Sequence, residues 1–220
     1  IEEFVRVLGI ECHGKDVFPS YGEMTPNVLR KALYGEELPQ VEYAKEKVIK
    51  RPPTFCAGCP HRGLFYRLGK RKDVMITGDI GCYTLGAVAP LAAMDMTLCM
   101  GGSVSAIHGF NKALGADSEK KTVAVIGDST FMHSGITGLV NMAYNGSNAT
   151  VIIVDNSITG MTGHQQNPTT GFNLKGDPCA KIDLETLCRS VGIRRVRVVD
   201  PYDLKQCDEA IKEELAANEP

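Results

Sequence analysis

Short, continuous apolar runs alternate with longer amphipathic segments from about Arg51 onward. The runs predict strands at Val74–Asp79, Thr97–Gly102, Thr122–Asp128, Thr150–Asn156 and Val196–Asp200. Because these runs lack polar alternation, they are typical of strands that are covered on both faces. The intervening segments predict helices at His61–Arg71, Ser103–Leu114, His133–Tyr144, Asp183–Val191 and Asp203–Leu215. This alternation indicates an α/β fold, a mainly parallel sheet with helices on both faces.

Residues 1–53 follow a different pattern. Thr25 at an N-cap, Pro26 at the first helical position and Gly35 past the end predict one short helix. The polar, proline-bounded stretch that follows is typical of a linker. We therefore expect a lead-in from a preceding domain at 1–53 and a second domain at 54–220. Since the chain opens with Ile in mid-pattern, we expect it to be part of a longer or processed polypeptide.

Composition narrows the class of protein. The 220 residues are 43% hydrophobic with a formal net charge of −2, which is ample for a packed core. Without a basic patch, nucleic-acid binding is not expected. No signal peptide is visible and no apolar run reaches about 18 residues, so we expect no membrane span and a cytoplasmic location. There, the eight cysteines are more often ligands, redox groups or core thiols than disulfides.

Several candidate site residues stand where the predicted strands end, which is where ligands bind in open parallel sheets. They include Asp79, Gly101, Asp128 and Asn156. Between Asp128 and Asn156 lie 27 residues, enough for one helix and one strand, so both can end neighbouring strands. A carboxylate and an amide oxygen converging there predict a Mg²⁺ site. The alternatives are a plain helix cap at Asp128 with Asn156 in a turn, or a phosphoacceptor Asp128.

A second group of candidates is the pair Cys56 and Cys59, with Cys82 further along. A C-x₂-C pair can bind zinc or an iron–sulfur cluster, or act as a redox dithiol. Structural zinc usually takes four ligands in two close pairs, whereas here one pair is present, with His61 just beyond it. The cysteines expected to be plain thiols are Cys12, Cys99, Cys188 and Cys207.

Several long motifs resemble those of the 2-oxoacid:ferredoxin oxidoreductases, a family of thiamine diphosphate enzymes. Gly127-Asp128-Ser129 followed by Asn156 is similar to the thiamine diphosphate motif, with Ser129 where Gly is usual. The other motifs are FCAGCPHRGLFYRL (55–68), TGDIGCYTLG (77–86), MGGSVSAIHGFNKALG (100–115) and DNSITGMTGHQQNPTTG (155–171). CPHRG and DIGCYTLG look most like the indolepyruvate branch. The resemblance covers roughly Arg51 to the C-terminus.

The resemblance implies an activity and a set of site residues. The activity is oxidative decarboxylation of an aryl 2-oxoacid such as indolepyruvate with coenzyme A, with a smaller partner subunit and with electrons passed to ferredoxin. Asp128 and Asn156 would bind Mg²⁺ together with the carbonyl of Ile158. The residues placed against the cofactor are Gly101, Ser103, Gly127, Ser129, Thr162 and Gln165. His61 is a candidate for a catalytic or phosphate-binding role.

The resemblance also implies a 4Fe–4S cluster on Cys56, Cys59 and Cys82, with a fourth ligand at Cys179 or beyond the chain end. Two alternatives remain open. A non-oxidative thiamine diphosphate-dependent 2-oxoacid decarboxylase or synthase would need no such cysteines, and a zinc-stabilised, non-catalytic α/β module would need no cofactor. Thiamine enzymes also use a Glu on a pyrimidine-binding domain. Residues 1–53 are too few to supply that domain, so we expect the chain alone to be inactive.

Overall fold

The computed structural model describes residues 1–219, except for the side chain of Lys45. The chain divides into two compact units, Ile1–Arg51 and Pro52–Pro220, which are described separately.

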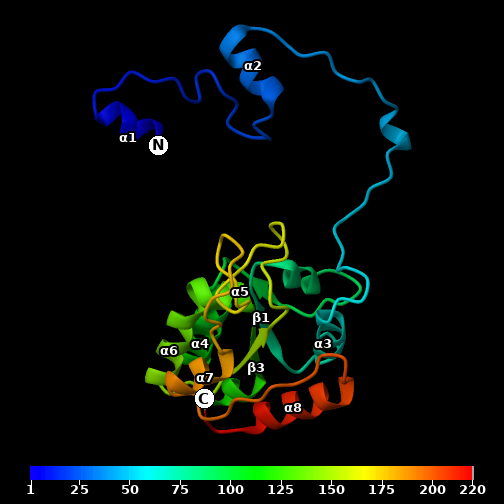
Figure 1. Cartoon of the computed structure of the whole chain (residues 1–220), viewed down its shortest axis with the longest axis vertical. Helices are drawn as coiled ribbons and strands as arrows, with labels where there is room; N and C mark the ends of the chain where they lie inside the picture. The colour runs from blue at the N-terminus through cyan, green and yellow to red at the C-terminus, as the bar shows by residue number, and fades with distance from the viewer. Residues whose placement is uncertain (220) are drawn as a thin grey trace. The chain divides into compact units, whose positions relative to one another are not determined.

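The first unit contains short helices joined by irregular chain (Figure 1). Helices α1 (Glu2–Val7) and α2 (Pro26–Tyr34) are followed by a 3₁₀ turn, η1, at Lys45–Lys47. The predicted signals of α2 are confirmed: Thr25 Oγ1 accepts a hydrogen bond from the Val28 N–H at 3.3 Å, and Gly35 ends the helix with φ 71°. The pattern gave no prediction for α1. Neither α1 nor α2 has a buried side chain.

The second unit is built on a four-stranded parallel sheet in the order β2-β1-β3-β4. The strands are β1 (Met75–Gly78), β2 (Met96–Thr97), β3 (Thr122–Gly127) and β4 (Thr150–Val154). Every residue of β3 is buried, as its unbroken apolar run predicts. Gly127 pairs with Val154, so β3 and β4 end side by side. The predicted α/β fold with a parallel sheet is confirmed.

Helices cover both faces of this sheet. They are α3 (His61–Leu68), α4 (Gly102–Leu114), α5 (Asp128–Thr130), α6 (Ile136–Tyr144), α7 (Leu184–Ser190) and α8 (Leu204–Ala216). Shorter turns are η2 (Cys82–Ala87), η3 (Ala116–Lys121) and η4 (Phe131–Gly135), of which η4 is π-helical.

The core lies in two clusters because successive side chains of a strand point to opposite faces. Val123 and Val125 pack with α3 and α8, while Ala124 and Ile126 pack with α4 and α6. Burial of a Val or Ile side chain stabilises the folded state by about 1.5–3 kcal/mol, so the residues on both faces of β3 contribute strongly to the stability of this unit.

Two of the predicted strands are wrong in whole or in part. The run Thr97–Gly102 forms a strand only at Met96–Thr97, because Gly101 turns with φ 84° and α4 begins at Gly102. Val196–Asp200 is not a strand. Its Val196 carbonyl accepts a hydrogen bond from the Arg189 side chain at 3.0 Å, so this carbonyl is bonded by a side chain and not by a strand ladder.

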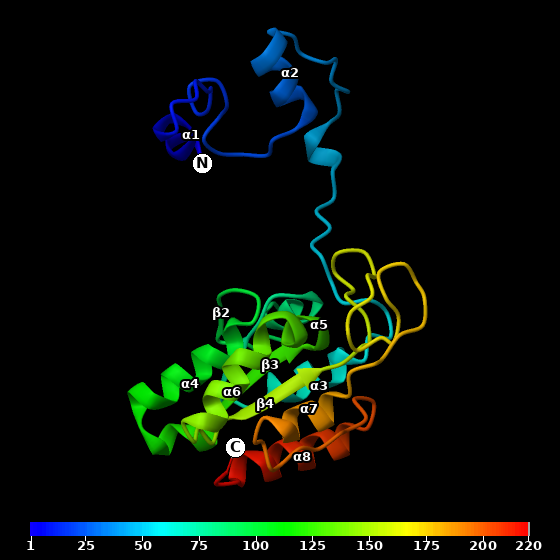
Figure 2. The ribbon, with the colours of Figure 1, turned by 60° about the vertical axis from the view of Figure 1, so that its left-hand side comes forward.

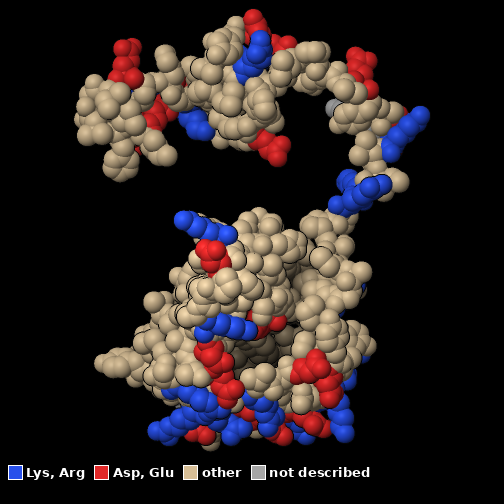
Figure 3. Space-filling model, in the orientation of Figure 1, with Lys and Arg blue, Asp and Glu red and all other residues tan. Residues whose placement is uncertain are grey.

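Ion pairs explain why the segment near Arg195 lies along α8. Arg195 contacts Glu214 at 2.8 Å, and Arg197 pairs with Glu213. Figure 3 shows basic and acidic side chains intermixed on the face over α8.

A further difference concerns the helix predicted at His133–Tyr144, which begins at Ile136 because the preceding turn is π-helical.

Candidate functional site

The carboxyl ends of β3 and β4 meet at one edge of the sheet. Because Gly127 is paired with Val154, the residues that follow, Asp128 and Asp155, leave the sheet side by side. Asn156 comes one residue later. The loop between β4 and α7, yellow to orange in Figure 2, rises beyond these strand ends. Residues that are far apart in the sequence motif therefore lie next to each other at the ends of β3 and β4.

Asp128 is buried, with 3% of its surface exposed. Its Oδ2 accepts hydrogen bonds from Asn167 Nδ2 and from Thr169 Oγ1, both at 3.1 Å. Burial raises the pKa of the Asp128 carboxyl, which the hydrogen bond from Asn167 opposes. Gly127, not Asp128, occupies the N-cap of α5. The carboxylate is therefore bonded to the loop and does not serve as the helix cap that was the alternative.

Asn156 is exposed and lies in a turn. Its Oδ1 accepts a hydrogen bond from the Ile158 N–H at 3.3 Å, while Ser157 adopts a left-handed φ of 53°. This is the turn that the alternative interpretation predicts. The same amide oxygen and the main-chain carbonyl of Ile158 follow the end of β4 by two and four residues.

The predicted diphosphate contacts are tied to one another within the loop. Ser129 Oγ accepts a hydrogen bond from Thr159 Oγ1 at 2.7 Å. Thr159 also pairs through its backbone with Gln165, at N–O distances of 3.0 and 3.2 Å. Thr162 Oγ1 donates to Gln165 Oε1 at 2.6 Å. The loop therefore closes on itself and on the start of α5.

Sequence reasoning gave no role to Asp79, which the structure places at the centre of a second network. Its carboxylate is fully buried. Oδ1 accepts from Gly101 N at 2.9 Å and from Ile80 N at 2.8 Å, and Oδ2 accepts from Ser103 N at 3.0 Å. Asp79 therefore fixes the end of β1 to the start of α4. Its position at a predicted strand end was the only signal in the sequence.

The same network defines Gly101 and Ser103. Gly101 combines φ 84° with close packing, since a Cβ there would lie 2.3 Å from Ser134 Oγ. Ser103 is 2% exposed, and its hydroxyl has no hydrogen-bond partner among residues 1–219. An unpartnered buried hydroxyl is costly, so a bound group that pairs with it would be stabilised.

The structure brings the three predicted cluster cysteines near one another. Burial raises the pKa of the Cys82 thiol, and the neighbouring Cys56 and Cys59 thiolates raise it further. A Cβ built on Gly160 would lie 3.5 Å from Cys82 Sγ and 3.7 Å from Asn156 Nδ2. Cys82 is therefore next to the loop that carries the predicted Mg²⁺ ligand.

These cysteines do not form a complete metal site. Over residues 1–219, no group of three or more Cys, His, Asp or Glu side chains has a geometry that could hold a metal ion. Cys179 is exposed on the loop, with its Sγ 3.7 Å from the Ala180 carbonyl oxygen. The described residues thus do not assemble a four-ligand cluster site.

His61 opens α3 and is 4% exposed. Burial lowers the pKa of its imidazole, although nearby Asp155 raises it. The neutral ring is therefore favoured, as a proton acceptor requires. His61 and Asp155 both line a pocket of about 450 Å³.

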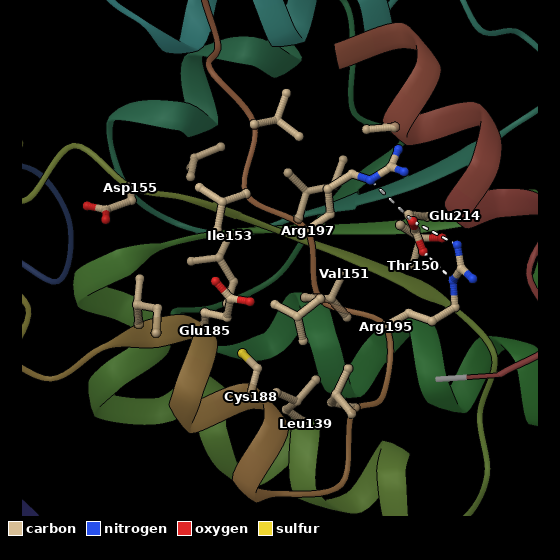
Figure 4. A pocket seen from close by; sticks show the side chains of 18 of the residues that line it. Leu139, Thr150, Val151, Ile153, Asp155, Glu185, Cys188, Arg195, Arg197 and Glu214 are labelled. Carbon is tan, nitrogen blue, oxygen red and sulfur yellow. Dashed lines mark hydrogen bonds and ion pairs between the residues drawn. The ribbon is translucent and has the colours of Figure 1, made fainter. Parts of the chain in front are cut away.

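This pocket follows β4 and is otherwise mainly apolar. Figure 4 shows Asp155 near the end of β4, Val151 and Ile153 along the strand, and Cys188 on α7. The extended segment 193–199 forms another wall. The pocket was not predicted from sequence, because it exists only where this segment lies apart from the edge of β4.

No helix within residues 1–219 is long and apolar enough to cross a membrane.

The family model "Thiamine pyrophosphate enzyme, C-terminal TPP binding domain" matches residues 79–220, which include Asp79, Asp128 and Asn156. The chain belongs to this thiamine pyrophosphate enzyme family. The thiamine diphosphate-binding domain predicted from the motifs is thereby confirmed.

The chain is similar to a subunit of several oxidoreductases. It is 41% identical to indolepyruvate oxidoreductase subunit IorA of Pyrococcus horikoshii, over 98% of this chain and 38% of that protein. The Thermococcus kodakarensis IorA is 39% identical over 94% of this chain and 36% of its own length. Ketoisovalerate oxidoreductase subunit VorA of Methanothermobacter thermautotrophicus is 28% identical over 87% and 43%. The predicted resemblance is confirmed, and the chain spans less than half the length of these relatives.

Solved structures share the fold. A 2-oxoglutarate:ferredoxin oxidoreductase from Magnetococcus marinus has a TM-score of 0.63 at 21% identity, over 80% of this chain and 64% of that one. Benzoylformate decarboxylase from Polynucleobacter necessarius has a TM-score of 0.51 at 14% identity, over 83% and 34%. At these identities the likeness concerns the fold alone.

Proposed function

We propose that this chain is the thiamine diphosphate- and Mg²⁺-binding part of a 2-oxoacid:ferredoxin oxidoreductase that acts on aryl pyruvates such as indolepyruvate. The observation that carries the proposal is the buried Asp128 carboxylate at the joint end of β3 and β4, within a family of thiamine pyrophosphate enzymes. The 41% identity to an indolepyruvate oxidoreductase subunit supports the substrate class.

The oxygen donors at the strand ends fit a hard divalent cation. Asp128 supplies a carboxylate, Asn156 an amide oxygen and Ile158 a main-chain carbonyl, which are donors that Mg²⁺ prefers. The unpartnered hydroxyl of Ser103 offers one further polar contact to the cofactor. When bound, thiamine diphosphate would supply the electron sink for decarboxylation of the 2-oxoacid.

In this proposal His61 takes part in proton transfer, and Gly127 and Ser129 contact the diphosphate. A neutral, buried imidazole can accept or return a proton at the reacting centre. A Cβ on Gly127 would lie 2.3 Å from the Tyr83 ring, so the ring packs directly against the backbone at the end of β3. Gly127 and Ser129 would then approach the diphosphate with their backbone N–H groups.

The cysteines are the feature that favours an oxidoreductase over a non-oxidative decarboxylase. We assign Cys56, Cys59 and Cys82 to an iron–sulfur cluster whose fourth ligand is Cys179 or a residue of another part of the protein. Residues 1–219 do not by themselves complete that site. Coenzyme A, ferredoxin and a smaller subunit are the remaining partners of the proposed reaction.

The test uses the full-length protein with its smaller subunit, purified without oxygen and supplied with Mg²⁺ and thiamine diphosphate. We expect indolepyruvate and coenzyme A to give sustained reduction of a viologen dye, with pyruvate as a weaker substrate. Release of CO₂ from indolepyruvate without dye reduction would contradict the oxidative assignment and support the decarboxylase alternative. Equal rates with pyruvate would contradict the aryl preference.

A further inference from the structure

Two side chains of the loop 155–183 reach back to the carboxylate of Asp128. Asn167 Nδ2 and Thr169 Oγ1 each lie 3.1 Å from Asp128 Oδ2. All three residues are buried: Asn167 is 8% exposed, Thr169 1% and Asp128 3%. Both donors therefore contact the same carboxylate oxygen.

The orientation of these donors is itself fixed. Asn167 Oδ1 accepts a hydrogen bond from the Thr169 N–H at 2.8 Å, which turns Nδ2 of the same amide toward Asp128. The Thr169 hydroxyl has one proton, and its Oγ1 lies 2.7 Å from Asn167 Oδ1 and 3.1 Å from Asp128 Oδ2, so it holds Asp128 either directly or through the Asn167 amide. The backbone carbonyl of Asn167 accepts hydrogen bonds from the N–H and the hydroxyl of Thr170, at 3.0 and 2.9 Å. The turn is therefore held by its own hydrogen bonds, which orient its side chains toward Asp128.

The loop also carries the other proposed ligand. Asn156 stands near its beginning and Asn167 eleven residues later, with the Thr159–Gln165 backbone pairing closing the chain between them. The same loop thus presents one ligand directly and holds the second, Asp128, through hydrogen bonds. The relative placement of the two ligands depends on this turn.

We propose that Asn167 and Thr169 are positioning residues for the metal ligand Asp128. They hold Oδ2 so that Oδ1 faces the cation together with Asn156. This inference rests on the proposed function, because it assumes a Mg²⁺–thiamine diphosphate site at Asp128. Groups that orient a metal ligand without touching the metal typically change metal affinity about 10- to 100-fold when they are removed.

The experiment measures Mg²⁺ affinity by titration calorimetry in the full-length protein with its partner subunit, at saturating thiamine diphosphate. Thr169→Val removes the hydroxyl at nearly constant volume, and we expect the Kd for Mg²⁺ to rise by about 10-fold or more. Thr169→Ser restores a hydroxyl and should bind Mg²⁺ nearly as well as the wild type. Thr170→Val is the matched control, because its hydroxyl bonds a backbone carbonyl and not Asp128.

The outcomes separate the two proposals. If the wild type binds Mg²⁺ and Thr169→Val binds it equally well, this inference is overturned while the proposed function stands. An equal loss in Thr170→Val would also overturn it, because the effect would then belong to the turn in general. If the wild type shows no Mg²⁺-dependent cofactor binding, the proposed function itself fails. Should Thr169→Val not fold, Asn167→Ala removes the other donor and is measured in the same way.

Discussion

At the scale of single residues, the site depends on groups whose burial changes their chemistry. The carboxylate of Asp128 is withdrawn from water and stabilised by two neutral donors, with an exposed fraction of 3%. A buried carboxylate of this kind is costly unless a cation or further donors complete its environment. In the proposed function, a bound divalent cation would offset part of this cost.

A thiol outside the cluster gives a prediction at this scale. Burial raises the pKa of Cys188 to about 11, from an ordinary value of 9.0. The thiolate is the reactive form, so Cys188 should resist iodoacetamide at pH 8 in the folded protein and react after unfolding in urea. Exposed Cys99 is the control and should be labelled in both states. Labelling of Cys188 at the Cys99 rate in the folded protein, measured by peptide mass spectrometry, would contradict this.

The same thiol affects stability at high pH. Because the pKa of Cys188 is raised in the folded state, the contribution of its protonated thiol to the free energy of unfolding is fully present below about pH 9. This contribution is lost as the pH rises toward 11.

At the scale of secondary-structure elements, Asp79 connects β1 to α4. Three backbone N–H groups, from Ile80, Gly101 and Ser103, depend on its carboxylate. Because Gly101 and Ser103 begin α4, a shift of this carboxylate would move the helix start and the hydroxyl of Ser103. The start of α4 is therefore held by the side chain of the residue that follows β1.

We predict that Asp79→Ala lowers the free energy of unfolding by about 2–6 kcal/mol, since the buried N–H groups of Gly101 and Ser103 would each cost about 1–3 kcal/mol without an acceptor. Asp79→Asn keeps one acceptor oxygen and should cost less. Urea unfolding of both variants is the measurement. A loss below about 0.5 kcal/mol, the range of ordinary surface substitutions, would show that α4 does not rely on Asp79.

Much of the fold could be predicted because β1, β3 and β4 are locally apolar and bounded by polar residues. The strand predicted at Val196–Asp200 failed, because Arg195 and Arg197 bind α8 and not the sheet edge, which no local pattern reveals. In the site, the motif spacing indicated Asp128 and Asn156. The contacts of Asp128 with Asn167 and Thr169 join residues 39 and 41 positions apart, so they emerge only from the folded loop.

At the scale of the whole molecule, the chain spans only part of the length of the relatives it matches. Its relatives are more than twice as long, and the chain covers 38% of the Pyrococcus horikoshii protein. The proposed reaction needs a pyrimidine-binding domain, a second subunit and a route for electrons. The three cysteines near the loop are where that route would begin.

We predict that Cys82→Ser in the full-length protein lowers the iron content and the rate of viologen reduction, because a thiolate ligand of the proposed cluster is lost. Thiamine diphosphate binding should be kept, since Cys82 is no part of the Mg²⁺ donor set. Cys99→Ser, an exposed cysteine outside the group, is the control. Wild-type iron content in Cys82→Ser would remove this residue from the cluster.

The most direct measurement is calorimetric titration of the full-length protein, with its partner subunit, by thiamine diphosphate with and without Mg²⁺. We expect saturable, Mg²⁺-dependent binding by the wild type and by Asp177→Ala, which removes an exposed carboxylate from the same loop. Asp128→Ala should fold but show no Mg²⁺-dependent binding, because the cation loses its anionic ligand. Unchanged cofactor affinity in Asp128→Ala would contradict the assignment of the site.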